Sequence, residues 1–102
     1  MDNQTIQEKI LADYRTLLTV KFDSPLVIYD KLKLLGERIQ QLAGSTQNEQ
    51  ENIKRAADLI QSAMTTEYAV FSEASTSDDK EQTLAQLKHK AAEACQLIGI
   101  HS

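Results

Sequence analysis

The sequence of 102 residues is poor in the residue types that cross-link, bend or interrupt a chain. It has one cysteine, one proline, three glycines and no tryptophan. Because Cys95 stands alone, no disulfide can form within the chain, and this fits a reducing cytoplasm. Glycine and proline mark the turns between short strands, so their scarcity argues against an all-β fold. Disulfide-rich secreted domains and β-sandwiches are therefore disfavoured.

Long apolar runs and basic charge are also lacking. No apolar run approaches the roughly 18–20 residues that span a bilayer, and no basic start leads into an apolar signal segment. The formal net charge of -4 disfavours a nucleic-acid partner, which would require a basic surface. The apolar fraction of 41% is too high for a disordered chain. Together with the length, these values predict one soluble, acidic domain over residues 1–102, in the cytoplasm.

Apolar residues recur at steps of three and four along the chain, which is the spacing of amphipathic helices. Short polar links separate these periodic segments, and short links favour antiparallel neighbours. We therefore predict an all-α fold, an antiparallel up-down four-helix bundle. The four helices are expected over Asn3 to Val20, Pro25 to Ala43, Thr46 to Glu73 and Asp78 to Ile98.

Helix starts are marked by capping residues. Ser24 is a good N-cap, and Pro25 then falls at the first helical position, where its missing N–H group costs nothing. Thr46 and Glu49 match the capping box, in which each side chain bonds the backbone of the other residue. The second and third helices are thus expected to begin at these positions.

Helix ends are marked by glycine. We expect Gly44 to end the second helix in the left-handed conformation, and Gly99 to end the fourth. Ile100 then supplies the apolar contact of a Schellman cap. Glu67 interrupts the apolar stripe of the third helix, so we expect it at the edge of that stripe.

The sequence offers no pattern typical of a metal site. His89 and His101 are too far apart for a helical pair, and neither H-E-x-x-H nor C-x-x-C occurs. Di-iron bundles use Glu-x-x-His, but Gln86 and Ile98 stand three residues before the two histidines. We therefore expect no metal and no cofactor.

Nucleophilic catalysis also lacks support. No G-x-S-x-G elbow surrounds a serine, and no glycine-rich loop suited to phosphate is present. Cys95 has no neighbouring base or cation that would activate its thiol, so we interpret it as a small residue in the core or at its boundary. The sequence predicts a protein that is not an enzyme.

One histidine leaves an alternative open. Phosphohistidine-transfer domains are four-helix bundles whose motif reads approximately His-x-Leu-Lys-Gly, with a further glycine about ten residues after the histidine. His89 and Gly99 have this spacing, but Ala92 stands in place of the lysine and Glu93 in place of the first glycine. A carboxylate beside a phosphorylated imidazole adds repulsion. The competing interpretation is that His89 is a solvated residue on a charged helix face.

Charge is uneven along the chain. The segment of residues 45–75 is acidic, whereas the last predicted helix carries a short basic turn. Such a turn is usually a solvated face. As a functional interpretation, it forms a partner-binding surface together with nearby apolar residues, if these are partly exposed. That surface comprises Lys88, His89, Lys90, Leu97, Ile98, Ile100 and His101.

Three stretches carry a resemblance to a known family. They are the opening stretch Ile10 to Leu18 (ILADYRTLL), the stripe of the second predicted helix, and the closing stretch from Leu84 to Gly99-Ile100. The stripe consists of Ile28, Leu32, Leu35, Ile39 and Leu42. Over nearly the whole chain, the order of elements resembles that of the immunity proteins of pediocin-like (class IIa) bacteriocins, in particular the enterocin A immunity group.

The resemblance implies a function. Members of this family protect a Gram-positive bacteriocin producer from inside the cell, act with the membrane components of the mannose permease that serves as receptor, and prevent lethal pore opening. Their C-terminal half carries much of the specificity, which corresponds here to the exposed part of Leu84 to Ser102. The tail after Gly99 is short, so a family feature that depends on a long C-terminal tail is not expected here. We expect a monomer or weak dimer, in the cytoplasm or at the inner face of the membrane.

Two other functions remain open at this stage. The first is a helical adaptor or oligomerisation module, which needs only an exposed helical face. The second is phosphotransfer through His89.

Overall fold

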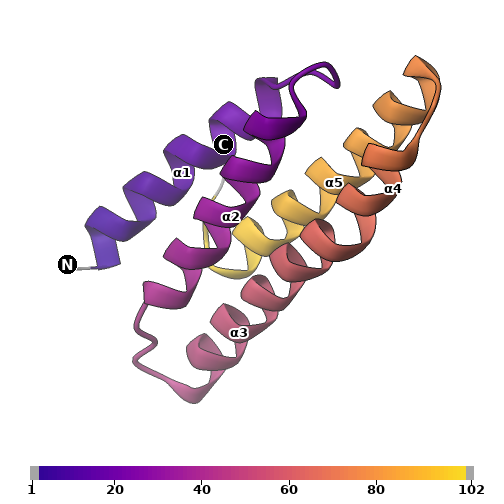
Figure 1. Ribbon diagram of the computed structural model, residues 1–102. Coiled ribbons are helices and arrows are strands. Elements are labelled where there is room, and N and C mark those ends of the chain that lie inside the picture. The colour runs from indigo at the N-terminus through magenta and orange to yellow at the C-terminus, as the bar shows by residue number, and fades with distance from the viewer. Residues whose placement is uncertain (1–2, 101–102) are drawn as a thin grey trace.

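Four helical rods make up residues 3–100, the part of the chain that the computed structural model describes (Figure 1). The third rod is a continuous run of α-helix, a π-helical turn (η1) and a second α-helix. No strand occurs within these residues, so the predicted all-α fold class is confirmed. The elements are α1 (Asn3–Thr19), α2 (Pro25–Gln41), α3 (Gln47–Ser62), η1 (Ala63–Glu67), α4 (Tyr68–Glu73) and α5 (Ser77–Leu97).

Successive rods run in opposite directions (Figure 1). Helix α1 packs against α2 and α5, and α3 packs against the same two helices, which places the rods around one axis. Asn3 and Ala43 exchange two hydrogen bonds, of 2.6 and 3.0 Å, which hold the start of α1 beside the end of α2. The resulting bundle measures 45 × 21 × 18 Å. Its length matches that of the third rod, since 27 helical residues at about 1.5 Å each extend about 40 Å.

Each rod buries one apolar stripe in a common core. Full burial of a Leu, Ile or Phe side chain contributes about 1.5–3 kcal/mol, so these positions carry most of the stability. The stripe predicted for the second helix is confirmed, with Leu42 half-buried at its end. The largest fully buried side chains are Phe71, Ile10, Leu17, Ile28, Leu32, Leu35, Ile39, Ile60, Leu87 and Cys95.

The prediction of a left-handed conformation at Gly44 is wrong. Helix α2 ends at Gln41, and its C-cap residue Leu42 is already extended, with φ -67° and ψ 143°. Gly44 is required for a different reason, because a Cβ atom there would lie 2.8 Å from the backbone nitrogen of Gln50. The link passes so close to the first turn of α3 that a side chain at this position would collide with backbone.

The Schellman cap predicted at the end of the fourth helix is confirmed. Gly99 has φ 79°, and its N–H group donates to the carbonyl of Gln96 at 3.1 Å. The N–H group of Ile100 donates to the carbonyl of Cys95 at 2.9 Å, which completes the paired bonds of this motif. Ile100 folds back and is only 7% exposed.

The helix starts follow the predictions with two differences. Thr46 Oγ1 accepts the N–H group of Glu49 at 3.1 Å, as a capping box requires. The carboxylate of Glu49 reaches back as expected and accepts a bond from the backbone of Thr46, but its stronger bonds come from the N–H and hydroxyl groups of Ser45, at 2.8 and 2.7 Å. These bonds lower the pKa of Glu49. Ser24 occupies the N-cap before Pro25 but makes no side-chain cap bond.

The third rod contains a π-turn that the sequence pattern did not predict. The N–H group of Tyr68 bonds to the carbonyl of Ala63, five residues earlier. The rod continues to Glu73 as predicted, and both Ala63 and Phe71 face the core. The π-turn widens the helix locally, and Glu67 is the last residue of that turn.

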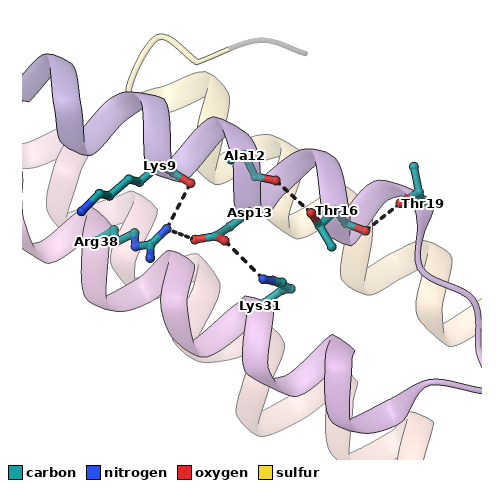
Figure 2. A network of polar contacts seen from close by, with 7 residues as sticks. All are labelled: Lys9, Ala12, Asp13, Thr16, Thr19, Lys31 and Arg38. Atoms are coloured by element: carbon teal, nitrogen blue, oxygen red, sulfur yellow. Dashed lines mark hydrogen bonds and ion pairs between the residues drawn. The ribbon is translucent and has the colours of Figure 1, made fainter.

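A buried carboxylate joins the first two rods. Asp13 lies on α1, is 6% exposed and points toward α2, between Arg38 and Lys31 (Figure 2). Arg38 Nη1 bonds to one carboxylate oxygen, and Lys31 Nζ lies 3.5 Å from the other. The same Arg38 nitrogen also donates to the carbonyl of Lys9 at 3.3 Å. Since the single anion is shared by two cations, it fixes the α1–α2 pair by charge as well as by packing.

Replacing Asp13 with alanine is expected to lower the free energy of unfolding by about 1–3 kcal/mol, because both cations lose their partner. Urea denaturation followed by circular dichroism measures this change. Asp30→Ala, at an exposed position on α2, is the matched control and should stay within about 0.5 kcal/mol of the unaltered protein. Equal effects of the two substitutions would contradict the assigned role of Asp13.

Candidate interaction surface

The residues of the predicted partner surface lie on or just after the second half of α5, but they serve different purposes. Lys88 is half-buried and points toward α1. Its Nζ atom donates to the carbonyls of Leu18 at 2.9 Å and Val20 at 2.6 Å. These carbonyls belong to the end of α1, where a cation also complements the helix dipole. Burial lowers the pKa of Lys88, and we interpret this lysine as a cap for α1.

Lys90 points to the other side of α5, toward the π-turn. Its Nζ atom lies 2.7 Å from a carboxylate oxygen of Glu67 and donates to Ser62 Oγ at 2.7 Å. The side chains of Lys90 and Glu67 are 28% and 15% exposed, so the pair is partly shielded from water. The lysine joins α5 to the third rod at the level of η1.

His89 is the most accessible member of the predicted surface among residues 3–100. Its side chain is 74% exposed, and its Nε2 atom lies 2.8 Å from a carboxylate oxygen of Glu93, one turn further along α5. An imidazole in this position can exchange hydrogen bonds with a partner, while Glu93 keeps the ring oriented.

The apolar members of the predicted surface are partly or fully buried. Leu97 and Ile98 are half-buried and pack against the core, and Ile100 belongs to the core itself. His101 lies outside the described residues. Of the predicted set, the structure brings His89, Lys90 and Leu97 to one open feature of the molecule.

That feature is a groove along the seam between the third rod and α5, which we name the α3–α5 groove. It consists of two open depressions that meet at Glu93, the larger with a volume of about 630 Å³. The larger one is lined by Arg55, Asp58, Leu59, Ser62, Glu93, Gln96 and Leu97. The smaller one, beside the π-turn, is lined by Glu67, Ala85, Gln86, His89, Lys90 and Glu93.

The groove is apolar at its base and acidic in balance. Leu59 and Leu97 supply half-buried apolar surface. Three carboxylates line it, against two basic side chains, and Lys90 is already paired with Glu67. The second oxygen of Glu67, Oε2, is shielded from solvent and has no hydrogen-bond partner among the described residues. Buried polar atoms are nearly always bonded, so this oxygen is an unused acceptor.

The wall contributed by the third rod was not predicted as a functional surface. The one sequence signal for it was Glu67, which interrupts an apolar stripe. π-Turns occur often at functional sites, and here the turn ends at Glu67, which faces Lys90. The α5 wall shows a clearer signal, because Gln86, His89 and Glu93 recur at helical spacing on one face.

The groove offers hydrogen bonds, charge and apolar contact. Within residues 3–100, no three or more His, Cys, Asp or Glu side chains are arranged to hold a metal ion. Cys95 is fully buried, and burial raises the pKa of its thiol to about 12. None of the helices in this range is long and apolar enough to cross a bilayer.

A second exposed feature lies at the start of α2. Leu26 is 82% exposed, and Val27 and Tyr29 are 41% and 42% exposed. The ring of Tyr29 packs on that of Tyr68 of α4, with centroids 5.2 Å apart. The Tyr68 hydroxyl donates to the carbonyl of Pro25 at 3.3 Å. The two tyrosines thereby fix the position of this apolar turn.

Comparisons of the chain with protein-family models, with curated proteins and with solved structures give no match. The resemblance to bacteriocin immunity proteins therefore stays a prediction from the sequence. The function has to be argued from the surface of the bundle.

Lys88→Met is expected to lower the free energy of unfolding by about 1–2 kcal/mol, since it removes two charge-assisted bonds to the end of α1. Urea denaturation measures the loss. Lys33→Met, at an exposed position on α2, is the control and should change stability by less than about 0.5 kcal/mol. If Lys88 served only as an exposed partner contact, the two variants would be equally stable.

Cys95 is expected to resist alkylation in the folded protein. With a pKa of about 12, its thiolate fraction at pH 8 is roughly a thousandfold or more below that of a free cysteine. Iodoacetamide labelling followed by mass spectrometry, with and without urea, measures the difference. Native labelling as fast as in urea would show that the thiol is accessible.

The buried thiol also makes the stability of the protein depend on pH. The fold favours the neutral thiol, whereas the unfolded chain loses this proton near pH 9. The free energy of unfolding therefore falls as the pH rises from about 9 toward 12, and Cys95→Ala removes this part of the pH dependence.

Proposed function

We propose that the protein is a bacteriocin immunity protein that gives the producing cell self-protection. It binds, from the cytoplasmic side and without catalysis, to the mannose permease receptor when the bacteriocin is bound. The observation that carries this proposal is the α3–α5 groove, an open surface feature with contact chemistry on the last helix of an all-α bundle. We place the protein in the cytoplasm or at the inner face of the membrane.

The position of the groove supports the proposal. The family resemblance implies that specificity resides in the exposed part of Leu84 to Ser102. The α5 wall of the groove runs from Ala85 to Leu97 and lies within that range. The expected contact residues His89, Lys90 and Leu97 line this wall, so resemblance and geometry favour the same surface.

The chemistry of the groove favours binding over reaction. The hydroxyl of Ser62 accepts a hydrogen bond from Lys90, which is charged and itself paired with Glu67, so no base is positioned to activate it. Phosphotransfer through His89 is the weakest candidate. The carboxylate of Glu93, bonded to the imidazole Nε2 atom, would repel a phosphoryl group there.

A helical adaptor or oligomerisation module is the second candidate, and the exposed turn at the start of α2 favours it. Leu26, Val27 and Tyr29 present apolar surface to solvent. A stable interface needs about 800 Å² from each partner, which three side chains do not supply by themselves. This turn fits a monomer or weak dimer, and light scattering across protein concentrations tests for self-association.

Production of the chain in a strain sensitive to class IIa bacteriocins tests immunity directly. We expect the inhibitory concentration of at least one such bacteriocin to rise. Glu93→Arg, which reverses a charge in the groove, should abolish the protection because it changes the contact surface without touching the core. The matched control is Glu73→Arg on an exposed turn of α4, which should leave protection intact.

Western blots must show equal soluble amounts of all three proteins. Unchanged sensitivity to a full panel of class IIa bacteriocins, with soluble protein present, would count against immunity and leave the adaptor function as the better explanation.

A further inference from the structure

The α3–α5 groove contains more acceptor capacity than the molecule uses. Glu67 pairs with Lys90 through one oxygen, while Oε2 has no hydrogen-bond partner among residues 3–100. Glu93 bonds to the imidazole of His89 and is half exposed. Asp58, on the opposite wall, is exposed and shows no ion pair within the described part of the chain.

We propose that the groove is the docking site for an amphipathic helical segment of a partner protein, and that this segment carries a lysine or arginine. The apolar face of the segment packs on Leu59 and Leu97. Its cationic side chain enters between Glu67 and Glu93. The occupant is thus defined by its chemistry, an apolar stripe with a basic residue at its edge.

The dimensions of the groove suit a helix. On α5 its lining runs from Ala85 to Leu97, which is about 18 Å of helix at 1.5 Å per residue. On α3, Arg55, Leu59 and Ser62 follow one another at helical spacing along the other wall. A seam between two helices of this length accommodates about three turns of a third helix, as in other helix-in-groove complexes.

The charge of the groove selects the partner. Asp58, Glu67 and Glu93 outnumber Arg55 and Lys90 in the lining, so the charge of the groove favours a basic residue over an acidic one. An incoming ammonium or guanidinium group bonds to the half-exposed carboxylate of Glu93, beside Glu67 in the same depression.

This inference rests on the proposed function only for the identity of the natural partner. The groove itself is testable without any receptor or bacteriocin. A direct binding experiment and the sensitivity assay therefore fail independently of each other.

The test uses the full chain, labelled with ¹⁵N, and two stapled model helices of about three turns. One peptide has a leucine stripe flanked by lysines, and the other has glutamates in place of the lysines. We expect the lysine peptide to shift amide signals along the seam, at Ser62, Glu67, Gln86 and Glu93, with a Kd on the order of 100 μM. Binding should weaken as salt concentration rises, since the contact is electrostatic.

Two variants separate the groove from general attraction to an acidic protein. Glu93→Gln, at an exposed position that leaves the fold intact, should weaken binding about fivefold or more, because the negative charge that attracts the cation is lost. Glu73→Gln removes the same charge from α4 outside the groove and should leave Kd unchanged. Glu67→Gln should act like Glu93→Gln, and its spectrum reports whether the fold is retained.

Three results would overturn the inference. They are shifts outside the seam, equal binding of the glutamate peptide, and equal weakening by Glu73→Gln and Glu93→Gln. Saturable binding to the seam without protection in the sensitivity assay would support the docking site and oppose bacteriocin immunity. Protection without peptide binding would support immunity and oppose the docking site.

Discussion

A helix with an apolar stripe on one side cannot bury that stripe by itself, and the arrangement of this protein depends on this constraint. Four rods with one stripe each satisfy it by sharing a single core, in which residues such as Leu35 and Phe71 are fully buried. Because the core takes the inner face of every rod, the outer faces and the seams between rods are left for other purposes. The groove follows from this, since it is the seam where α5 and the third rod meet solvent.

Polar contacts fix the register that packing alone leaves loose. Asp13 holds α1 against α2 through Arg38 and Lys31. Helix α5 is held on both sides by two lysines that are two residues apart, so they point in roughly opposite directions. Lys88 reaches the end of α1, and Lys90 reaches the π-turn. The basic turn that suggested a partner surface therefore divides into two structural anchors and one accessible histidine between them.

The sequence predicted the features that depend on neighbouring residues. Apolar spacing predicted the stripes, and the Gly99-Ile100 pair predicted a Schellman cap, because both effects act within two or three turns. The misses depend on how separate elements of the chain come together in space. Glycine is needed at position 44 because the backbone there lies against Gln50 of the next helix. Asp13 is buried in a hydrogen bond with Arg38, which lies 25 positions away in the sequence. The ion pair of Glu67 and Lys90 joins the π-turn to α5. The spacing of apolar residues in the sequence does not reveal which rods become neighbours. Half of the candidate surface, the α5 wall, was predictable, and the opposite wall was not.

The contact between Lys88 and the end of α1 has a consequence for the order in which the molecule assembles. It joins residues separated by 68 and 70 positions, whereas the α1–α2 pair closes through a short link. Closing a longer loop costs more chain entropy, so contacts of high sequence separation form late in folding. On a ribosome, the carbonyls at the end of α1 stay uncapped until almost the whole chain has emerged. Helix α5 thus completes the first helix as well as the bundle, and the same helix carries the surface proposed to recognise a partner.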